Sequence, residues 1–285
     1  MYKKRSKIKE IKGDIMKSIL FVLKENIANL YRIKSITKYE LESDVRDTKL
    51  GFLWNILSPS IQIFTFWIVF GIGIRSGQDV HGVAFLPWMI VGMMVWFFVS
   101  PCITQGVGCI YSKRNIITKM KFPVSILPTT VVAKELINHL FMVGIVVVLL
   151  LVLGFKPSIY WLGCIYYMFC AFCFCIALNT ITSVLNMFTR DVSKLVKALM
   201  RMLLYLTPIL WTLEKIEKSH ALLATLLKLN PLFYIVEGYR ESFFYQTTFM
   251  NHPTLTIYFW VVTIAMYCLG SWLMYKFKSR FIDMM

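Results

Sequence analysis

The chain has 285 residues, of which 58% are hydrophobic, 15% aromatic and only 16% charged. Soluble domains average about 45–50% apolar and about 25% charged residues, so this composition, with a mean hydropathy of +0.64, excludes most soluble enzymes and transcription factors. The chain has 31 Lys and Arg residues against 15 Asp and Glu, a net charge of +16. In a membrane protein, such an excess first indicates which loops face the cytoplasm.

Residues 1–50 form the first predicted unit, a basic cytoplasmic region. We expect residues 1–17 to be a mobile arm. Apolar residues then recur at helical spacing from Met16 to Tyr31, with Lys, Glu, Asn and Arg residues between them. This pattern predicts an amphipathic helix that is too polar to cross a membrane and lies in its interface; a soluble helix packed on a partner is the alternative.

Residues 51–285 form the second predicted unit, a six-span transmembrane permease domain. A membrane-crossing helix needs roughly 20 apolar residues, and five segments are long enough. A sixth segment, 198–213, is shorter, but the distribution of charge requires it. The predicted spans are 53–74, 84–105, 124–153, 160–186, 198–213 and 254–275. The predicted fold class is therefore an all-α integral membrane protein.

The Lys and Arg residues orient these spans. The loops and ends predicted on one side hold 15 of them, in segments 31–50, 106–123, 187–197 and 276–285. The segments on the other side hold six, in 75–83, 154–159 and 214–253. Because an excess of Lys and Arg marks the cytoplasmic face, both termini are predicted to be cytoplasmic.

The inner loops 106–123 and 187–197 are candidate docking elements. In the first, Ile110, Tyr111, Ile117 and Met120 predict the apolar stripe of a short helix that Pro123 ends. Such a helix on the cytosolic face would fit a groove in a partner protein; contact with anionic lipid is the alternative. In the second, Asp191 suits the first turn of a new helix.

The outer segment 214–253 contains two apolar runs, 221–227 and 231–236, that are too short to cross a membrane. Runs of this length predict re-entrant or interfacial helices, the second of which would begin at Pro231.

The sequence contains few of the residue patterns that are typical of enzymes. The four His residues are scattered, without an H-E-x-x-H pattern, and no G-x-S-x-G motif is present. Cys170 and Cys173 lie in an apolar run, so we expect them to pack as small hydrophobic residues and predict no metal site and no catalytic residues.

Lys134, Glu135 and His139 form an ionisable cluster within a span. Because ionisable side chains inside a membrane are costly, we treat the cluster as a candidate functional site. The cluster could be an inter-helix structural pair, the lining of a polar path or a catalytic group.

The sequence also contains no motif for ATP hydrolysis or proton coupling that could drive transport. No glycine is followed by lysine, so the chain contains no P-loop. Apart from Glu135, every carboxylate lies at a membrane end or in a loop, which leaves no acidic relay for proton coupling. By elimination, the sequence indicates a transporter that depends on a separate motor. A membrane enzyme acting on lipid-linked sugars is the competing class.

Several segments, in order along nearly the whole chain, resemble the permeases of type-2 ABC polysaccharide exporters. They are 46–54 with Pro59, Pro87-Trp88 with Gly92 and 96–98, 119–123, Arg190-Asp191 and 229–240. The last of these, Leu229-Asn230-Pro231 through Tyr239-Arg240, is most similar to the teichoic acid translocation permeases.

The resemblance implies a homodimer in a bacterial plasma membrane, bound to two copies of a separate ABC ATPase subunit that carries the ATP and magnesium; the chain itself would need no cofactor. It implies outward movement of a lipid-pyrophosphate-linked polymer, with wall teichoic acid as the first expectation. O-antigen or capsular polysaccharide, or small lipids, are the alternative cargoes. The predicted coupling residues in the two inner loops are Tyr111, Lys113, Arg114, Ile117, Lys119, Met120, Lys121, Arg190 and Asp191.

The chemistry of such a substrate suggests which residues form its path. A pyrophosphate at the inner leaflet would favour a basic rim containing Arg46, Lys49 and Arg201. Sugars slide over aromatic faces, and the predicted path residues on two spans are Phe64, Trp67, Phe70, Arg201 and Tyr205. Ordinary packing against lipid or a second copy is the alternative for the aromatic stripe.

Overall fold

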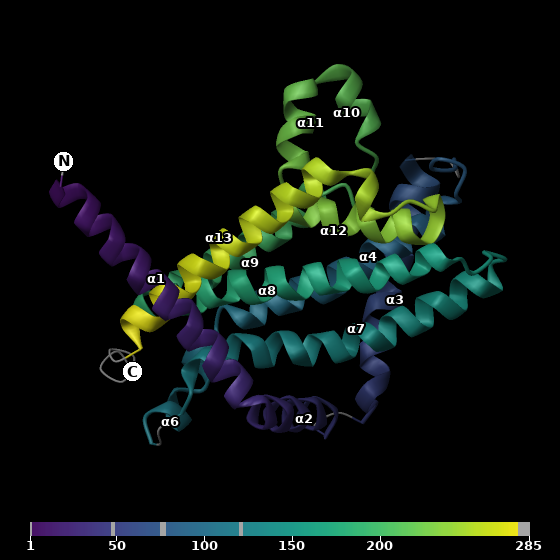
Figure 1. Ribbon diagram of the computed structural model, residues 1–285. Helices are drawn as coiled ribbons and strands as arrows, with labels where there is room; N and C mark the ends of the chain where they lie inside the picture. Colours follow the sequence, from purple (N-terminus) through teal and green to yellow (C-terminus); the bar gives the residue numbers. More distant parts are fainter. Residues whose placement is uncertain (1, 47–48, 75–77, 120–121, 279–285) are drawn as a thin grey trace.

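The computed structural model describes residues 2–46, 49–74, 78–119 and 122–278, and most of these residues are helical (Figure 1). Within them, five segments are long and apolar enough to cross a membrane: Trp54–Ile74, Phe85–Gly106, Val124–Val152, Ile159–Phe188 and Pro253–Phe277. The all-α membrane fold is therefore confirmed, and these five segments closely match five of the predicted spans.

The predicted span 198–213 is wrong in its bounds. Helix α9 runs from Asp191 to Leu206 and ends at Thr207, whose backbone is extended. The cause is Pro208, because a proline disfavours helical backbone in the residue before it and has no N–H to continue the helix. The remaining candidate for a sixth crossing is α11 (Ala221–Lys228) followed by α12 (Pro231–Arg240) and the π-helix η5 (Glu241–Tyr245), which together are bent by 85°.

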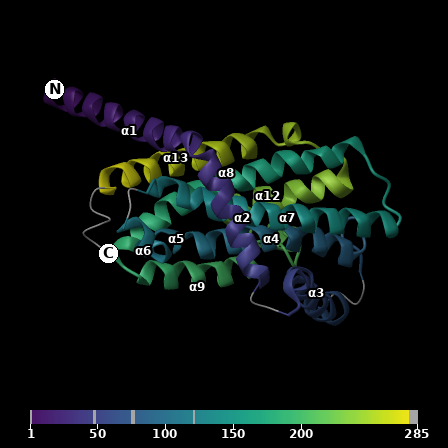
Figure 2. The same cartoon turned by 90° about the horizontal axis from the view of Figure 1, so that it is seen from below.

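The long helices form a bundle with α4 (Phe85–Gly106) at its centre (Figure 2). Most of α4 is buried, against α7 (Leu127–Val152), α8 (Gly163–Phe188), α9 and α12. Helix α13 (Pro253–Phe277) packs along α8 on the outside of the bundle. By contrast, α3 (Trp54–Phe66) and its π-helical extension η2 (Trp67–Ile74) have almost no fully buried residues, although Phe66, Trp67 and Phe70 pack partly against the core.

The N-terminal region consists of α1 (Tyr2–Ala28) and α2 (Leu30–Arg46). Helix begins at Tyr2, so residues 2–17 of the expected basic arm are helical. Part of α1 packs on α13, where the rings of Phe21 and Tyr275 lie 5.4 Å apart. The opposite side of α1 leaves apolar side chains exposed, as a helix in a membrane interface requires: Met16, Leu20, Leu23 and Ile27. Helix α2 then turns and crosses the bundle beside α7 (Figures 1 and 2).

The first inner loop contains two short helices, α5 (Cys109–Ser112) and α6 (Arg114–Ile117). Ile110 and Ile117 are buried in a small apolar cluster with residues of α1, α7, α8 and α13. Two of the four residues of the expected apolar stripe, Ile110 and Ile117, therefore face the chain itself and support the loop. Met120 and Lys121 lie outside the described residues.

The outer segment contains α10 (Glu214–Ser219), α11, α12, η5 and the 3-10 turn η6 (Phe249–Asn251). Pro231 occupies the first turn of α12, as predicted, and the Asn230 side chain caps it by accepting a 3.0 Å hydrogen bond from the backbone N–H of Leu232. Three short turns precede long helices elsewhere in the chain: η1 (Gly51–Leu53) before α3, η3 (Val124–Ile126) before α7 and η4 (Ile159–Leu162) before α8.

At its other end, α12 is fixed by Arg240, which is fully buried. Its guanidinium donates 2.7 Å hydrogen bonds to the carbonyl oxygens of Pro208 and Ile209. Those carbonyls follow the end of α9, where helical hydrogen bonding stops, so Arg240 satisfies polar groups that the proline break leaves without helical partners.

Candidate functional site

A polar cavity of about 470 Å³ lies between α3, α4, α7 and α9. One side has aromatic side chains, from Trp54, Trp96 and Phe97. Polar residues from all four helices provide much of the remaining lining: Asn55, Ser58, Gln62, Ser100, Thr104, Glu135, Asn138, His139, Lys197 and Arg201. A cavity of this character among apolar helices is what a hydrophilic substrate would need.

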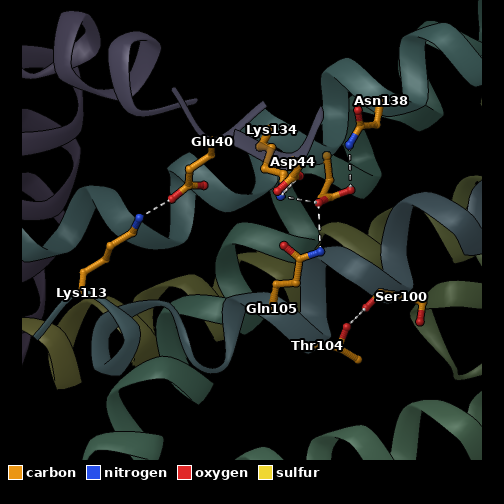
Figure 3. Close-up of polar contacts among 9 residues, drawn as sticks. Glu40, Asp44, Ser100, Thr104, Gln105, Lys113, Lys134 and Asn138 are labelled. Carbon is orange, nitrogen blue, oxygen red and sulfur yellow. Dashed lines mark hydrogen bonds and ion pairs between the residues drawn. The ribbon is translucent and has the colours of Figure 1, made fainter. Parts of the chain in front are cut away.

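Glu135 of α7 anchors the polar wall of this cavity. It is 5% exposed and accepts a 3.1 Å hydrogen bond from the amide of Gln105 on α4. Its other carboxylate oxygen accepts a 3.3 Å bond from Asn138, one turn further along α7 (Figure 3). These donors offset the cost of placing a carboxylate in the bundle.

Lys134, the neighbour of Glu135, reaches out of the bundle to the N-terminal helices. Its Nζ lies 2.6 Å from a carboxylate oxygen of Asp44 on α2 and 3.7 Å from Glu135 (Figure 3). One turn earlier on α2, Glu40 forms a 2.6 Å ion pair with Lys113 of the first inner loop (Figure 3). Lys134 therefore forms an inter-helix ion pair with Asp44, whereas Glu135 and His139 line the cavity.

His139 is held tightly at the cavity's edge. Its ring stacks on Phe98 at 4.7 Å, and its Nε2 lies 2.8 Å from the Tyr239 hydroxyl. The hydrogen bond joins α7 to the outer helix α12, so His139 connects the cavity wall to the outer segment.

Helix α9 supplies the cationic wall. Lys197, Met200, Arg201 and Leu204 line the cavity, spaced three and four residues apart on one face of the helix. The predicted path residue Arg201 is therefore part of the cavity. Tyr205 is not among its lining residues; its side chain is 56% exposed.

The predicted aromatic stripe lies elsewhere on the first span. Phe64, Trp67 and Phe70 are not among the lining residues of the cavity. The rings of Phe64 and Trp67 are 6.1 Å apart, but Phe70 contacts Phe66 instead. Phe64 is exposed, whereas Trp67 and Phe70 are half-buried against the core of the bundle, and the helix changes to a π-helix at Trp67. The cavity aromatics Trp54, Trp96 and Phe97 were not identified as path residues from the sequence.

The two inner loops meet at Tyr111. The guanidinium of Arg114 lies 4.7 Å from the centre of its ring, and that of Arg190, from the loop before α9, lies 4.5 Å from it. Each distance is within the range of a cation–π contact. The structure thus brings together three of the predicted coupling residues. Nearby Asp191 is exposed and pairs with Lys194 at 3.0 Å.

The remaining predicted basic residues are on the surface. Lys119 at the end of the first inner loop is exposed, as are Arg46 at the end of α2 and Lys49 just after it. Among the described residues, no three His, Cys, Asp or Glu side chains lie close enough to hold a metal ion.

This arrangement, a polar cavity within a bundle of long apolar helices, is that of a multi-pass membrane permease. Residues 31–244 match the ABC-2 type transporter family, and the chain belongs to that family, which has no catalytic activity of its own.

The relatives agree with this assignment. The chain is 28% identical to the O-antigen export system permease protein RfbA of Myxococcus xanthus, over 74% of this chain and 79% of that protein. It is 25% identical to an RfbA of Klebsiella pneumoniae, over 92% and 98%. It is 23% identical to the polysialic acid transport protein KpsM of Escherichia coli, over 74% and 80%. These names favour polysaccharide export and do not support the first expectation of wall teichoic acid.

Proposed function

We propose that this chain is the permease subunit of an ABC exporter that moves a lipid-pyrophosphate-linked polysaccharide, of the O-antigen or capsular kind, outward across a bacterial plasma membrane. The observation that carries the proposal is the polar cavity, with cations on α9 and aromatic rings from α3 and α4. The relatives named for O-antigen export and polysialic acid transport support the class of polymer.

In this proposal, the lipid end of the polymer enters first, from the inner leaflet. Arg201 and Lys197 attract the pyrophosphate, and the planar guanidinium of Arg201 is suited to bidentate contact with phosphate oxygens. A lone arginine within a membrane costs roughly 2.5–3.5 kcal/mol on insertion scales, and an anion in the cavity would offset that cost. The sugar units then slide over Trp54, Trp96 and Phe97, which offer stacking without tight polar binding. Arg46 and Lys49 form a basic rim on the way in.

The energy comes from a separate ABC ATPase subunit, which would hold the ATP and magnesium. The surface around Tyr111 is the candidate docking site for it, because this surface joins both inner loops and carries Arg114 and Arg190. Exposed Lys119 adds to the positive charge, so an acidic groove on the ATPase would be complementary.

A homodimer with two ATPase subunits completes the exporter. The exposed apolar side chains of α3 and η2 support this arrangement, because this span has the fewest buried residues of the five candidate spans in the described part of the chain. Its exposed side chains include Leu57, Ile61, Phe64, Ile68 and Ile72. A second copy that packs there would place two polar cavities side by side.

The test is reconstitution in nanodiscs with the ATPase subunit that copurifies from the native membrane. We expect a lipid-pyrophosphate-linked oligosaccharide to stimulate ATP hydrolysis, whereas the free oligosaccharide does not. Stimulation by a lipid pyrophosphate without sugar would instead indicate a small-lipid permease. Chemical conversion of the lipid-linked sugar by this chain alone would contradict the proposal and indicate a membrane enzyme.

A further inference from the structure

We propose that α2 is a mechanical link between the inner loop 106–123 and the wall of the polar cavity, and that Glu40 and Asp44 are the positioning residues through which it acts. The inference rests on the proposed function, because it concerns how the state of an ATPase on the inner loops reaches the substrate cavity.

The link begins with two carboxylates on one face of α2. Glu40 and Asp44 are four residues apart, so they lie one above the other on the same side of the helix. Glu40 contacts Lys113 at 2.6 Å, and Asp44 contacts Lys134 at 2.6 Å. Lys113 belongs to the loop that carries Tyr111, whereas Lys134 belongs to the membrane helix α7. One helix thus holds both elements by ion pairs of similar length.

The contact to α7 continues into the cavity. Lys134 has a second contact, 3.7 Å from Glu135, and Glu135 lines the cavity. The same oxygen of Glu135 that faces Lys134 also accepts the hydrogen bond of Gln105, near the end of α4. A movement of α2 that withdraws Asp44 would leave Lys134 with Glu135 as its neighbour. Glu135 would then turn toward Lys134 and away from Gln105, which changes the charge and shape of the cavity wall.

The packing around these ion pairs leaves room for such a movement. A second cavity, of about 320 Å³, lies between α2, the inner loop and α7, and it is lined by Glu40, Asp44, Lys113 and Lys134. The two ion pairs therefore border open space and are not enclosed by apolar packing. Contacts of this kind can break and re-form without opening a core, whereas close-packed contacts cannot.

The burial of the partners differs in a way that sets the direction of the coupling. The side chain of Lys134 is 9% exposed and that of Asp44 is 53% exposed. A buried cation left with one partner is costly, whereas a half-exposed carboxylate can be solvated. Lys134 therefore needs α2 more than α2 needs Lys134, and the position of α2 determines how Glu135 is paired.

The experiment uses the whole exporter in nanodiscs, with Glu40→Lys as the main variant and Glu42→Lys as its matched control. Glu42 lies on the same helix and pairs with Lys38 within α2, at 3.7 Å between exposed side chains. We expect Glu40→Lys to keep ATPase association and basal hydrolysis but to lower the polymer exported per ATP at least tenfold. Glu42→Lys should stay within twofold of the unchanged exporter.

A second readout needs no polymer. A cysteine replacing Ser58, which lines the cavity, is labelled with a thiol reagent with and without ATP bound to the partner, in a background without the native cysteines. We expect ATP to change the labelling rate at least fivefold in the exporter and in Glu42→Lys, but less than twofold in Glu40→Lys and in Asp44→Asn. Asp44→Asn removes the charge without adding bulk, and so covers the case in which Glu40→Lys does not fold.

The outcomes separate the two proposals. Failure of any sugar-linked lipid to stimulate hydrolysis would contradict the proposed function, while the labelling still tests the link. A labelling change that persists in Glu40→Lys and Asp44→Asn, or that is missing from the unchanged exporter, would overturn the link. So would equal loss of export in Glu40→Lys and Glu42→Lys.

Discussion

The guanidinium carbon of Arg240 lies 3.4 Å from the centre of the Trp88 ring. Trp88 belongs to the central helix α4, and the same guanidinium bonds to the carbonyls that follow α9. Glu237 on the preceding turn of α12 contacts it at 3.3 Å. One side chain from the segment 214–253 therefore joins α4 and α12 to the end of α9.

We predict that Arg240→Gln destabilises the protein by about 3–5 kcal/mol, because it leaves two buried carbonyl groups without charged donors. The stability of Arg240→Lys should fall between that of the unchanged protein and that of Arg240→Gln. An ammonium can reach one carbonyl but cannot stack as a plane on Trp88. Lys228→Gln is the control, a half-buried cation of α11 that pairs with Glu217. Thermal unfolding in detergent measures all three. Equal unfolding temperatures for Arg240→Gln and Lys228→Gln would contradict the prediction.

Close packing between α8 and α12 should depend on a glycine. A Cβ atom at Gly238 would overlap the ring of Tyr167, a buried residue of α8, whereas one at Gly144 on α7 would meet open space. We expect Gly238→Ala to cost about 1–3 kcal/mol of stability through overpacking. Gly144→Ala should be neutral or slightly stabilising, because alanine favours a helix. Fluorescence-detected gel filtration after heating compares the amounts of folded protein that remain. An equal loss of folded protein in Gly238→Ala and Gly144→Ala would contradict the prediction.

The role of Arg201 can be separated from that of a membrane anchor. We predict that Arg201→Gln abolishes stimulation of ATP hydrolysis by a lipid-pyrophosphate-linked oligosaccharide, whereas Arg201→Lys keeps part of it, because a point charge still attracts phosphate. Basal hydrolysis and assembly should be unchanged. Lys194→Gln, an exposed cation on the same helix that pairs with Asp191, should be stimulated normally. Normal stimulation of Arg201→Gln would remove this residue from the path.

Tyr111 should matter for docking through its ring. Both arginine contacts lie within this chain and hold the docking surface in one arrangement; each contributes about 0.5–1 kcal/mol at exposed sites. Their loss in Tyr111→Ala should therefore weaken association with the ATPase by up to roughly thirtyfold, through loss of preorganisation. Tyr111→Phe keeps the ring and should bind within twofold of the unchanged chain. Binding is measured by titration of the purified subunit onto nanodiscs. Equal weakening in both variants would show that the hydroxyl, not the ring, is needed.

The orientation of the chain is also testable. In a background without the native cysteines, a cysteine replacing Lys218 of α10 should react with an impermeant reagent added to intact cells. A cysteine replacing Lys119, at the end of the first inner loop, should react only after the cells are permeabilised. The Lys and Arg asymmetry of the loops is the reason for this expectation. The reverse pattern would place the termini outside.

Features that depend on local sequence were predictable. The five long spans follow from runs of apolar residues, and the start of α12 follows from Pro231, because both signals lie within the segment that they specify. The end of α9 also has a local signal, Thr207-Pro208. The predicted span 198–213 passed over it because the following Ile-Leu-Trp run is apolar. The apolar face of α1 was identified, although its partner on α13 was not.

The candidate site was less predictable, because it depends on distant pairs. Lys134 and Asp44 are 90 positions apart, and the sequence shows that Lys134 needs a partner without showing which one. Arg201 was found because a lone arginine in an apolar segment stands out. The cavity aromatics Trp54 and Trp96 were missed because the spacing of three along the first span pointed to Phe64, Trp67 and Phe70, none of which lines the cavity.

The size of the polar cavity has a consequence for the length of the cargo. At about 470 Å³ it falls within the range of about 300–1,000 Å³ typical of sites for small molecules, so it can hold the head of a long polysaccharide but not its whole contour. An exporter built on this chain would therefore not select its cargo by length. Short and long polymers with the same head should start equally well, export time should grow in proportion to the number of sugars, and the length distribution at the cell surface would be set by the enzymes that build the chains.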